Sequence, residues 1–135
     1  MEKVQIPQSH ADLMTQKKAF AHLATVMPDG TPHVTPVWFD MANGNIRVNT
    51  ARGRVKDRNM RQNAAVALSI LDPENPYRHV AIRGRVVNMI EEGEADPHID
   101  SLAKKYLGEE KYSMRRPGEA RVIFEIEPTF VAVMG

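Results

Sequence analysis

Apolar and polar residues alternate along much of the chain, which is the pattern of half-buried β-strands. The clearest case lies at 79–89. One face carries Val80, Ile82, Gly84 and Val86, and the other carries Ala81, Arg83, Arg85 and Val87. The pattern predicts further strands at 20–27, 31–41, 46–50, 64–71 and 120–133. The stretch 64–71 is apolar almost throughout and is expected to be covered on both faces. Pro128 interrupts the last stretch, which is one strand or a pair.

Short turn sequences separate the first three strands. Pro28-Asp29-Gly30 combines a proline that presets φ with a glycine that accepts a positive φ. Asn43-Gly44 is the pair favoured in tight two-residue hairpins. Both turns therefore predict antiparallel hairpins.

Three short helices complete the expected elements. One begins near Ser9, a possible cap, and ends near 17–18; the others span 54–62 and 94–106. In the last helix, Ile99, Leu102 and Tyr106 have helical spacing. Strands joined mainly by hairpins predict a mainly β fold, an antiparallel β-barrel with short helices at its ends, as a single domain over 1–135. A parallel doubly wound sheet is disfavoured because no helices separate the first three strands.

Composition excludes several classes of function. The net charge is +1 and aromatic residues make up 6% of the chain, which gives no basis for nucleic-acid binding. Cysteine is absent, and the five histidines show no metal-binding spacing. No apolar run reaches the roughly 18 residues of a membrane span, and residues 1–10 lack the apolar core of a signal peptide. We therefore expect a cytoplasmic protein without a metal, nucleic acid or membrane as partner.

A basic turn follows the third predicted strand. Its five cations fall within ten positions and only Asp57 opposes them: Arg52, Arg54, Lys56, Arg58 and Arg61. Asn49 and Thr50 end the preceding strand, and Gly53 lies in the turn. Cations beside the exposed amides of a helix start suit a phosphate. The alternative is a solvated helix face, since three of the arginines lie at i, i+4 and i+7.

Two other segments are candidates for a binding site. Pro32 and Pro36 mark the second strand as an edge or a bulged segment. Apolar residues on both of its faces, Val37 and Trp38 among them, would pack against a flat ring system, a second subunit, or both. Tyr77, Arg78 and His79 precede the fifth strand. They form either a structural cluster at the strand start or a second wall of a cleft.

Three stretches together carry a resemblance to a known family. Residues 20–26, 29–39 and 54–59 resemble the pyridoxamine 5′-phosphate oxidase-like split β-barrel superfamily, and the similarity runs from about residue 8 to 135. Within it, the pattern is most similar to the branch of oxidoreductases that depend on the deazaflavin coenzyme F420. The resemblance implies an FMN-binding split β-barrel of Greek-key-like antiparallel topology. It also implies a homodimer with cofactor clefts at the interface.

The resemblance also implies a set of cofactor-binding residues. Arg54, Lys56 and Asn59 match residues that hold the cofactor's phosphate and acidic tail, and Arg52 and Arg58 extend this group. Val37 and Trp38 match the strand that flanks the ring. Asn49 and Thr50 match the strand end beneath the ribityl chain and phosphate. Tyr77, Arg78 and His79 match a segment usually contributed by the other protomer.

The implied function is hydride transfer from reduced deazaflavin to an electron-poor double bond of a small organic substrate. No protein nucleophile is needed, and we assign no catalytic residue. Two alternatives stay open: an FMN-binding oxidoreductase, and a non-catalytic barrel that binds flavin or another small molecule. A haem-sequestering barrel is the weakest of these because the sequence has no metal-ligand constellation. Pyridoxamine-phosphate oxidase activity is disfavoured, since those enzymes carry extra segments.

Overall fold

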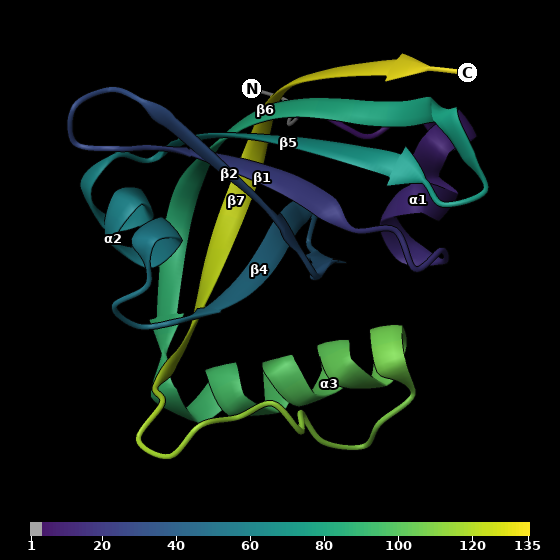
Figure 1. Ribbon diagram of the computed structural model, residues 1–135. Coiled ribbons are helices and arrows are strands. Elements are labelled where there is room, and N and C mark those ends of the chain that lie inside the picture. The colour runs from purple at the N-terminus through teal and green to yellow at the C-terminus, as the bar shows by residue number, and fades with distance from the viewer. Residues whose placement is uncertain (1–3) are drawn as a thin grey trace.

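The computed structural model describes residues 4–135 and has one curled, seven-stranded antiparallel sheet. Its strands are β1 (Ala21–Val26), β2 (Pro32–Val37), β3 (Phe39–Ala42), β4 (Asn45–Ala51), β5 (Ala65–Asp72), β6 (Asn75–Glu91) and β7 (Arg121–Met134). The helices are α1 (Ala11–Thr15), α2 (Val55–Gln62) and α3 (Ala95–Leu107), with 3₁₀ turns η1 (Gln8–His10) and η2 (Glu92–Glu94). Figure 1 shows α3 across one end of the sheet, with α1 and α2 on opposite sides. The mainly β prediction is confirmed.

The second predicted strand, 31–41, is divided at Trp38, so its prediction as one strand was wrong. The strand order is β2-β1-β5-β6-β7-β4-β3, which makes β2 and β3 the two edges of the sheet. Pro32 and Pro36 lack the N–H that an inner strand must donate, so β2 is suited to an edge. The chain passes from one edge directly to the other through Trp38. This residue therefore lies where the curled sheet comes back toward itself.

The hairpin turns are those that the sequence predicts. Gly30 has φ 88°, and Asp29 accepts a hydrogen bond from the Thr31 amide at 2.9 Å. Asn43 and Gly44 have φ values of 55° and 79°, as a two-residue hairpin with both central residues left-handed requires.

Pro128 does not divide the last strand. Strand β7 is continuous, and Pro128 is paired with Gly84 of β6 where the ladder shifts register. A proline is tolerated at such an irregular point because one ladder hydrogen bond is already lost there.

The core fills the inside of the curled sheet. The alternation predicted for β6 is observed, because Val80 and Ile82 are buried while Arg83 and Arg85 are exposed. Strand β5 buries only one face fully, and Ala67 on its outer face is half-buried. The expectation of two covered faces is therefore not met within one chain. The largest fully buried side chains include Phe39, Phe124, Leu13, Met14, Leu23, Ile46 and Ile70.

Helices α2 and α3 are each fixed to the sheet by specific contacts, and they flank the cavity described in the next section. The amide of Gly53, which has φ 92°, donates to the buried Asp57 carboxylate at 2.8 Å, so the chain turns sharply into α2. Arg61 pairs with Asp57 at 2.9 Å and also with Glu91. Helix α3 packs on β4 and β7 and ends at Gly108, which has φ 73°. No helix within 4–135 is long and apolar enough to cross a membrane.

Candidate functional site

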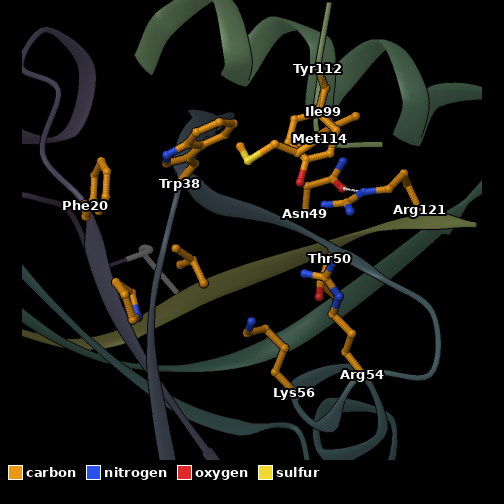
Figure 2. A pocket seen from close by; sticks show the side chains of 12 residues that line it. Phe20, Trp38, Asn49, Thr50, Arg54, Lys56, Ile99, Tyr112, Met114 and Arg121 are labelled. Carbon is orange, nitrogen blue, oxygen red and sulfur yellow. Dashed lines mark hydrogen bonds between the residues drawn. The ribbon is translucent and has the colours of Figure 1, made fainter. Parts of the chain in front are cut away.

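A cavity of about 180 Å³ lies between the sheet, α2, α3 and the segment that follows α3 (Figure 2). Its lining residues are Phe20, Pro36, Val37, Trp38, Asn49, Thr50, Arg54, Lys56, Ile99, Tyr112, Met114 and Arg121. Six of them were predicted from the sequence as cofactor-binding residues: Val37, Trp38, Asn49, Thr50, Arg54 and Lys56. They come together because three parts of the chain meet at one point: the passage between the two sheet edges at Trp38, the end of β4 and the start of α2.

One side of the cavity is cationic. Lys56 is half-buried and has no ion-pair partner among residues 4–135. Burial lowers the pKa of Lys56, and the positive charges of Arg54 and Arg121 lower it further. Each of these effects disfavours a lone cation, so an anion in the cavity would relieve them.

The two arginines share one carboxylate. Glu119 Oε1 lies 3.3 Å from Arg54 Nη2 and 3.2 Å from Arg121 Nη1. The Arg121 contact is close enough for an ion pair but lacks hydrogen-bond geometry. Thr50 is 1% exposed, and its hydroxyl has no hydrogen-bond partner within the described part of the chain. The cationic side therefore has unused capacity for charge and for hydrogen bonds.

A second side of the cavity is aromatic, and it meets the cationic side where Arg121 Cζ lies 5.2 Å from the centroid of the Tyr112 ring. Trp38 stacks on Tyr106 with ring centroids 5.4 Å apart and planes 5° apart, and Tyr112 meets Trp38 edge-on at 6.0 Å. The Tyr106 hydroxyl donates to the Ala19 carbonyl at 2.7 Å. Burial raises the pKa of Tyr106 to about 12, so the hydroxyl keeps its proton at neutral pH. The result is a rigid, flat wall that suits a ring system.

The sequence-based prediction missed six lining residues: Phe20, Pro36, Ile99, Tyr112, Met114 and Arg121. Arg121 offered a local signal, since it is a charge at the start of the apolar strand β7. Its place at the cavity follows from the register that pairs it with Ala51 of β4. Tyr112 is placed by its backbone amide, which donates to Asp100 of α3 at 2.8 Å. Neither pairing leaves a short-range pattern.

Three of the predicted residues near the basic turn do not line the cavity. Arg52 and Arg58 are exposed. Asn59 is buried, and its amide donates to Thr25 Oγ1 at 3.0 Å, which fastens α2 to β1. Within this chain, Asn59 therefore fixes the position of α2 on the sheet and does not contact the cavity.

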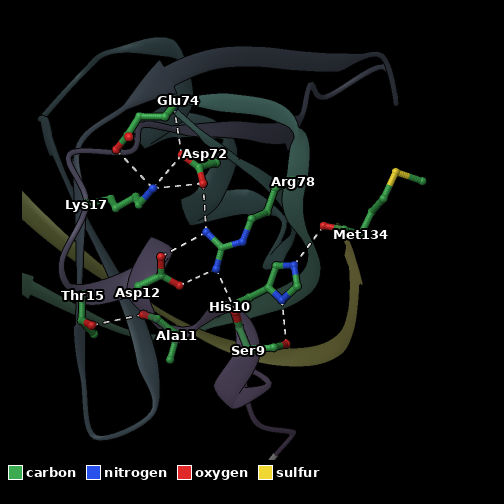
Figure 3. A network of polar contacts seen from close by, with 10 residues as sticks. All are labelled: Ser9, His10, Ala11, Asp12, Thr15, Lys17, Asp72, Glu74, Arg78 and Met134. Carbon is green, nitrogen blue, oxygen red and sulfur yellow. Dashed lines mark hydrogen bonds and ion pairs between the residues drawn. The ribbon is translucent and has the colours of Figure 1, made fainter.

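Tyr77, Arg78 and His79 lie outside this cavity. Figure 3 shows Arg78 among the polar contacts that join β6 to α1. Arg78 pairs with Asp12 at 2.6 Å and Asp72 at 2.9 Å, while Tyr77 is 79% exposed. The Glu74 backbone amide lowers the pKa of Asp72 to about 2, and Lys17 and Arg78 act in the same direction. A cofactor role for these three residues stays a prediction that depends on a second copy of the chain.

The chain belongs to the family described as "Pyridoxamine 5′-phosphate oxidase", because the model of that family matches residues 6–134. An F420 reductase of known structure is 33% identical, with a TM-score of 0.79 and coverage of 94% of this chain and 98% of that one. A conserved hypothetical protein from Mycobacterium tuberculosis is 25% identical, with a TM-score of 0.75 and coverage of 98% and 86%.

A haem storage protein from Vibrio cholerae shares the fold at 16% identity, with a TM-score of 0.73 and coverage of 98% and 96%. No curated protein matches the chain. The split-barrel fold therefore occurs in proteins whose names indicate different functions, and the chemistry must be argued from this chain's own site.

Proposed function

We propose that this protein is an oxidoreductase that binds coenzyme F420 and reduces an electron-poor double bond of a small organic substrate. The observation that carries the proposal is Lys56, a half-buried cation without an ion-pair partner among residues 4–135, which faces a flat aromatic wall across one cavity. That combination suits a ligand with a phosphate at one end and a ring at the other. The similarity to an F420 reductase supports it.

Each side of the cavity has a role in this proposal. Lys56 and Arg54 hold the phosphate near the amides at the start of α2, and the free hydroxyl of Thr50 completes the hydrogen bonds. Val37 and Trp38 flank the ring. The exposed Arg52 and Arg58 would attract the acidic tail of F420, which carries more negative charge than FMN.

The residues of the chain bind and orient, and the cofactor carries the chemistry. When bound, reduced F420 would supply a hydride, and a proton completes the reduction of the double bond. Trp38 is held rigid by its stack on Tyr106, so it limits how the ring can tilt. Tyr112 and Met114 cover the cavity from the segment after α3 and reduce access of water to the reacting atoms.

A homodimer is part of the proposal. The outer face of the sheet exposes apolar side chains, with Val34 62% and Phe130 46% exposed. They line a shallow pocket together with small residues such as Ala67 and Ala81. A second copy on this face would cover β5 on both sides, as its apolar sequence predicts. Sedimentation velocity at micromolar concentration should give a dimer, and a purely monomeric species would contradict this part.

The experiment is a titration of the purified protein with F420 and with FMN, followed by the fluorescence of Trp38, the only tryptophan. We expect Lys56→Met to weaken F420 binding by roughly 10- to 100-fold, as expected for one lost charge-assisted contact. Lys104→Met is the matched control, because Lys104 is exposed on α3 and its one ion-pair partner within the described residues is the exposed Glu110.

Equal affinity of the wild type and Lys56→Met for F420 would contradict the assignment of Lys56 to the cofactor site. A yellow protein that releases stoichiometric FMN on denaturation would favour the FMN-dependent alternative. Binding of either cofactor without transfer of a hydride to any acceptor would favour a non-catalytic binding protein.

A further inference from the structure

A buried polar chain runs behind the cavity, and Asn49 is at its centre. Asn49 Nδ2 lies 2.9 Å from the Ala95 carbonyl and 3.0 Å from His98 Nδ1, and Asn49 Oδ1 lies 2.9 Å from Arg121 Nε. Figure 2 shows the bond between Asn49 and Arg121 at the cavity wall. All three side chains are at least nine-tenths buried, so each of these contacts replaces water.

The chemistry of two neighbours fixes the orientation of the Asn49 amide. Arg121 Nε–H can only donate, so the Asn49 atom that faces it must be the oxygen. The Ala95 carbonyl can only accept, so the atom that faces it must be the amide nitrogen. The same nitrogen faces His98 Nδ1, which must therefore accept a hydrogen bond.

His98 is consequently a neutral imidazole with its proton on Nε2. That nitrogen lies 3.1 Å from Asp40 Oδ1 and donates to it. Arg47 holds the same carboxylate with two hydrogen bonds, at 2.9 and 2.6 Å. A chain of contacts thus links Asp40 of β3, His98 of α3, Asn49 of β4 and Arg121 of β7.

A second proton on His98 would break this arrangement. Nδ1–H would face the NH₂ group of Asn49, and both groups would then be donors. If Asn49 turned its oxygen to His98, it would present NH₂ to Arg121 Nε–H, which is again donor against donor.

We propose that His98 is a positioning residue for the anion site: by accepting a hydrogen bond from Asn49, it keeps Asn49 Oδ1 on Arg121 and so holds the Arg121 charge at the cavity wall. This inference rests on the proposed function only in that the cavity binds an anion. It assigns a role to a helix residue that does not itself line the cavity.

The tautomer can be measured without any ligand. In ¹⁵N-histidine NMR spectra near neutral pH, we expect His98 to show an unprotonated Nδ1 and a protonated Nε2. The His98→Asn variant identifies the signals by their loss. A His98 that is protonated on Nδ1 would overturn the inference, whatever the function of the cavity proves to be.

The second test uses sulfate, which is a dianion near neutral pH. Binding is followed at that pH by the amide NMR signals of residues 52–57. His98→Asn should bind sulfate as the wild type does, because its carbonyl can still accept a hydrogen bond from Asn49.

His98→Phe removes the acceptor and should bind sulfate about threefold or more weakly than the wild type. Ser101→Ala is the control on the same helix, since in the described part of the chain the Ser101 hydroxyl donates to the backbone carbonyl of His98 and to no side chain. Wild-type affinity in His98→Phe, or an equal loss of affinity in His98→Asn and His98→Phe, would overturn the inference. Absence of sulfate binding in the wild type would instead count against the anion site itself.

Discussion

Replacing Arg121 by Met is expected to lower the free energy of unfolding by about 3–5 kcal/mol, because it leaves a buried carboxylate short of its partner. The Glu119 side chain is 6% exposed, and among residues 4–135 it would retain Arg54 alone, at 3.3 Å. Asn49 Oδ1 would lose its donor at 2.9 Å. Methionine nearly preserves the length of the side chain, so the loss reports mainly the charge and hydrogen bonds. Urea-induced unfolding followed by circular dichroism measures it.

Two further variants make this prediction specific. Arg115→Met removes an arginine whose partners are Asp96 and Asp100 at the surface, and we expect a cost of at most about 1 kcal/mol. In the double variant Arg121→Met with Glu119→Gln, the uncompensated charge is gone, so part of the lost stability should return. If the costs of Arg121→Met and Glu119→Gln, each measured alone, add up to the cost of the double variant, Glu119 and Arg121 do not act as a pair.

A Gly84→Val variant is expected to be destabilised by about 3 kcal/mol, with a fall in melting temperature on the order of 10 °C. A Cβ on Gly84 would lie 2.7 Å from Ile126 Cγ2 and 2.9 Å from the Glu127 carbonyl oxygen. The side chain of Ile126 could move, but the Glu127 backbone belongs to β7 and is held by the ladder with β6. The register shift opposite Pro128 would therefore have to be rebuilt.

Arg85→Val is the control, because it places the same side chain one position along β6 on the exposed face. Gly84→Ala should show a smaller loss and keeps the prediction testable if the valine variant does not fold. A melting temperature for Gly84→Ala equal to that of the wild type would contradict the close approach of the two strands.

Residues that are close in sequence carried most of the correct predictions. Alternation in β6 and the Asn43-Gly44 turn depend on neighbours a few positions apart, so they are visible without the fold. The basic turn was visible for the same reason, since its charges are concentrated within ten positions. The family pattern added Val37, Trp38, Asn49 and Thr50 as expected neighbours of that turn.

Features that depend on distant pairing could not be predicted in this way. The division of 31–41 at Trp38 arises because β2 and β3 pair with different strands at opposite edges of the sheet. Apolar residues run through the stretch without a break, so the pattern contains no mark of the crossover. The hydrogen bond from Asn59 to Thr25, which fastens α2 to β1, likewise joins residues 34 positions apart.

The amino-acid sequence alone therefore establishes the mainly β class, the hairpins and a cluster of five cations with a single acid among them, because these follow from local spacing and charge. The three-dimensional arrangement adds the aromatic wall opposite Lys56 and the buried link from His98 through Asn49 to Arg121. That link joins β4 to a residue 72 positions away in β7. It exists only because the strand register brings a donor, an amide and an acceptor together in a place that excludes water.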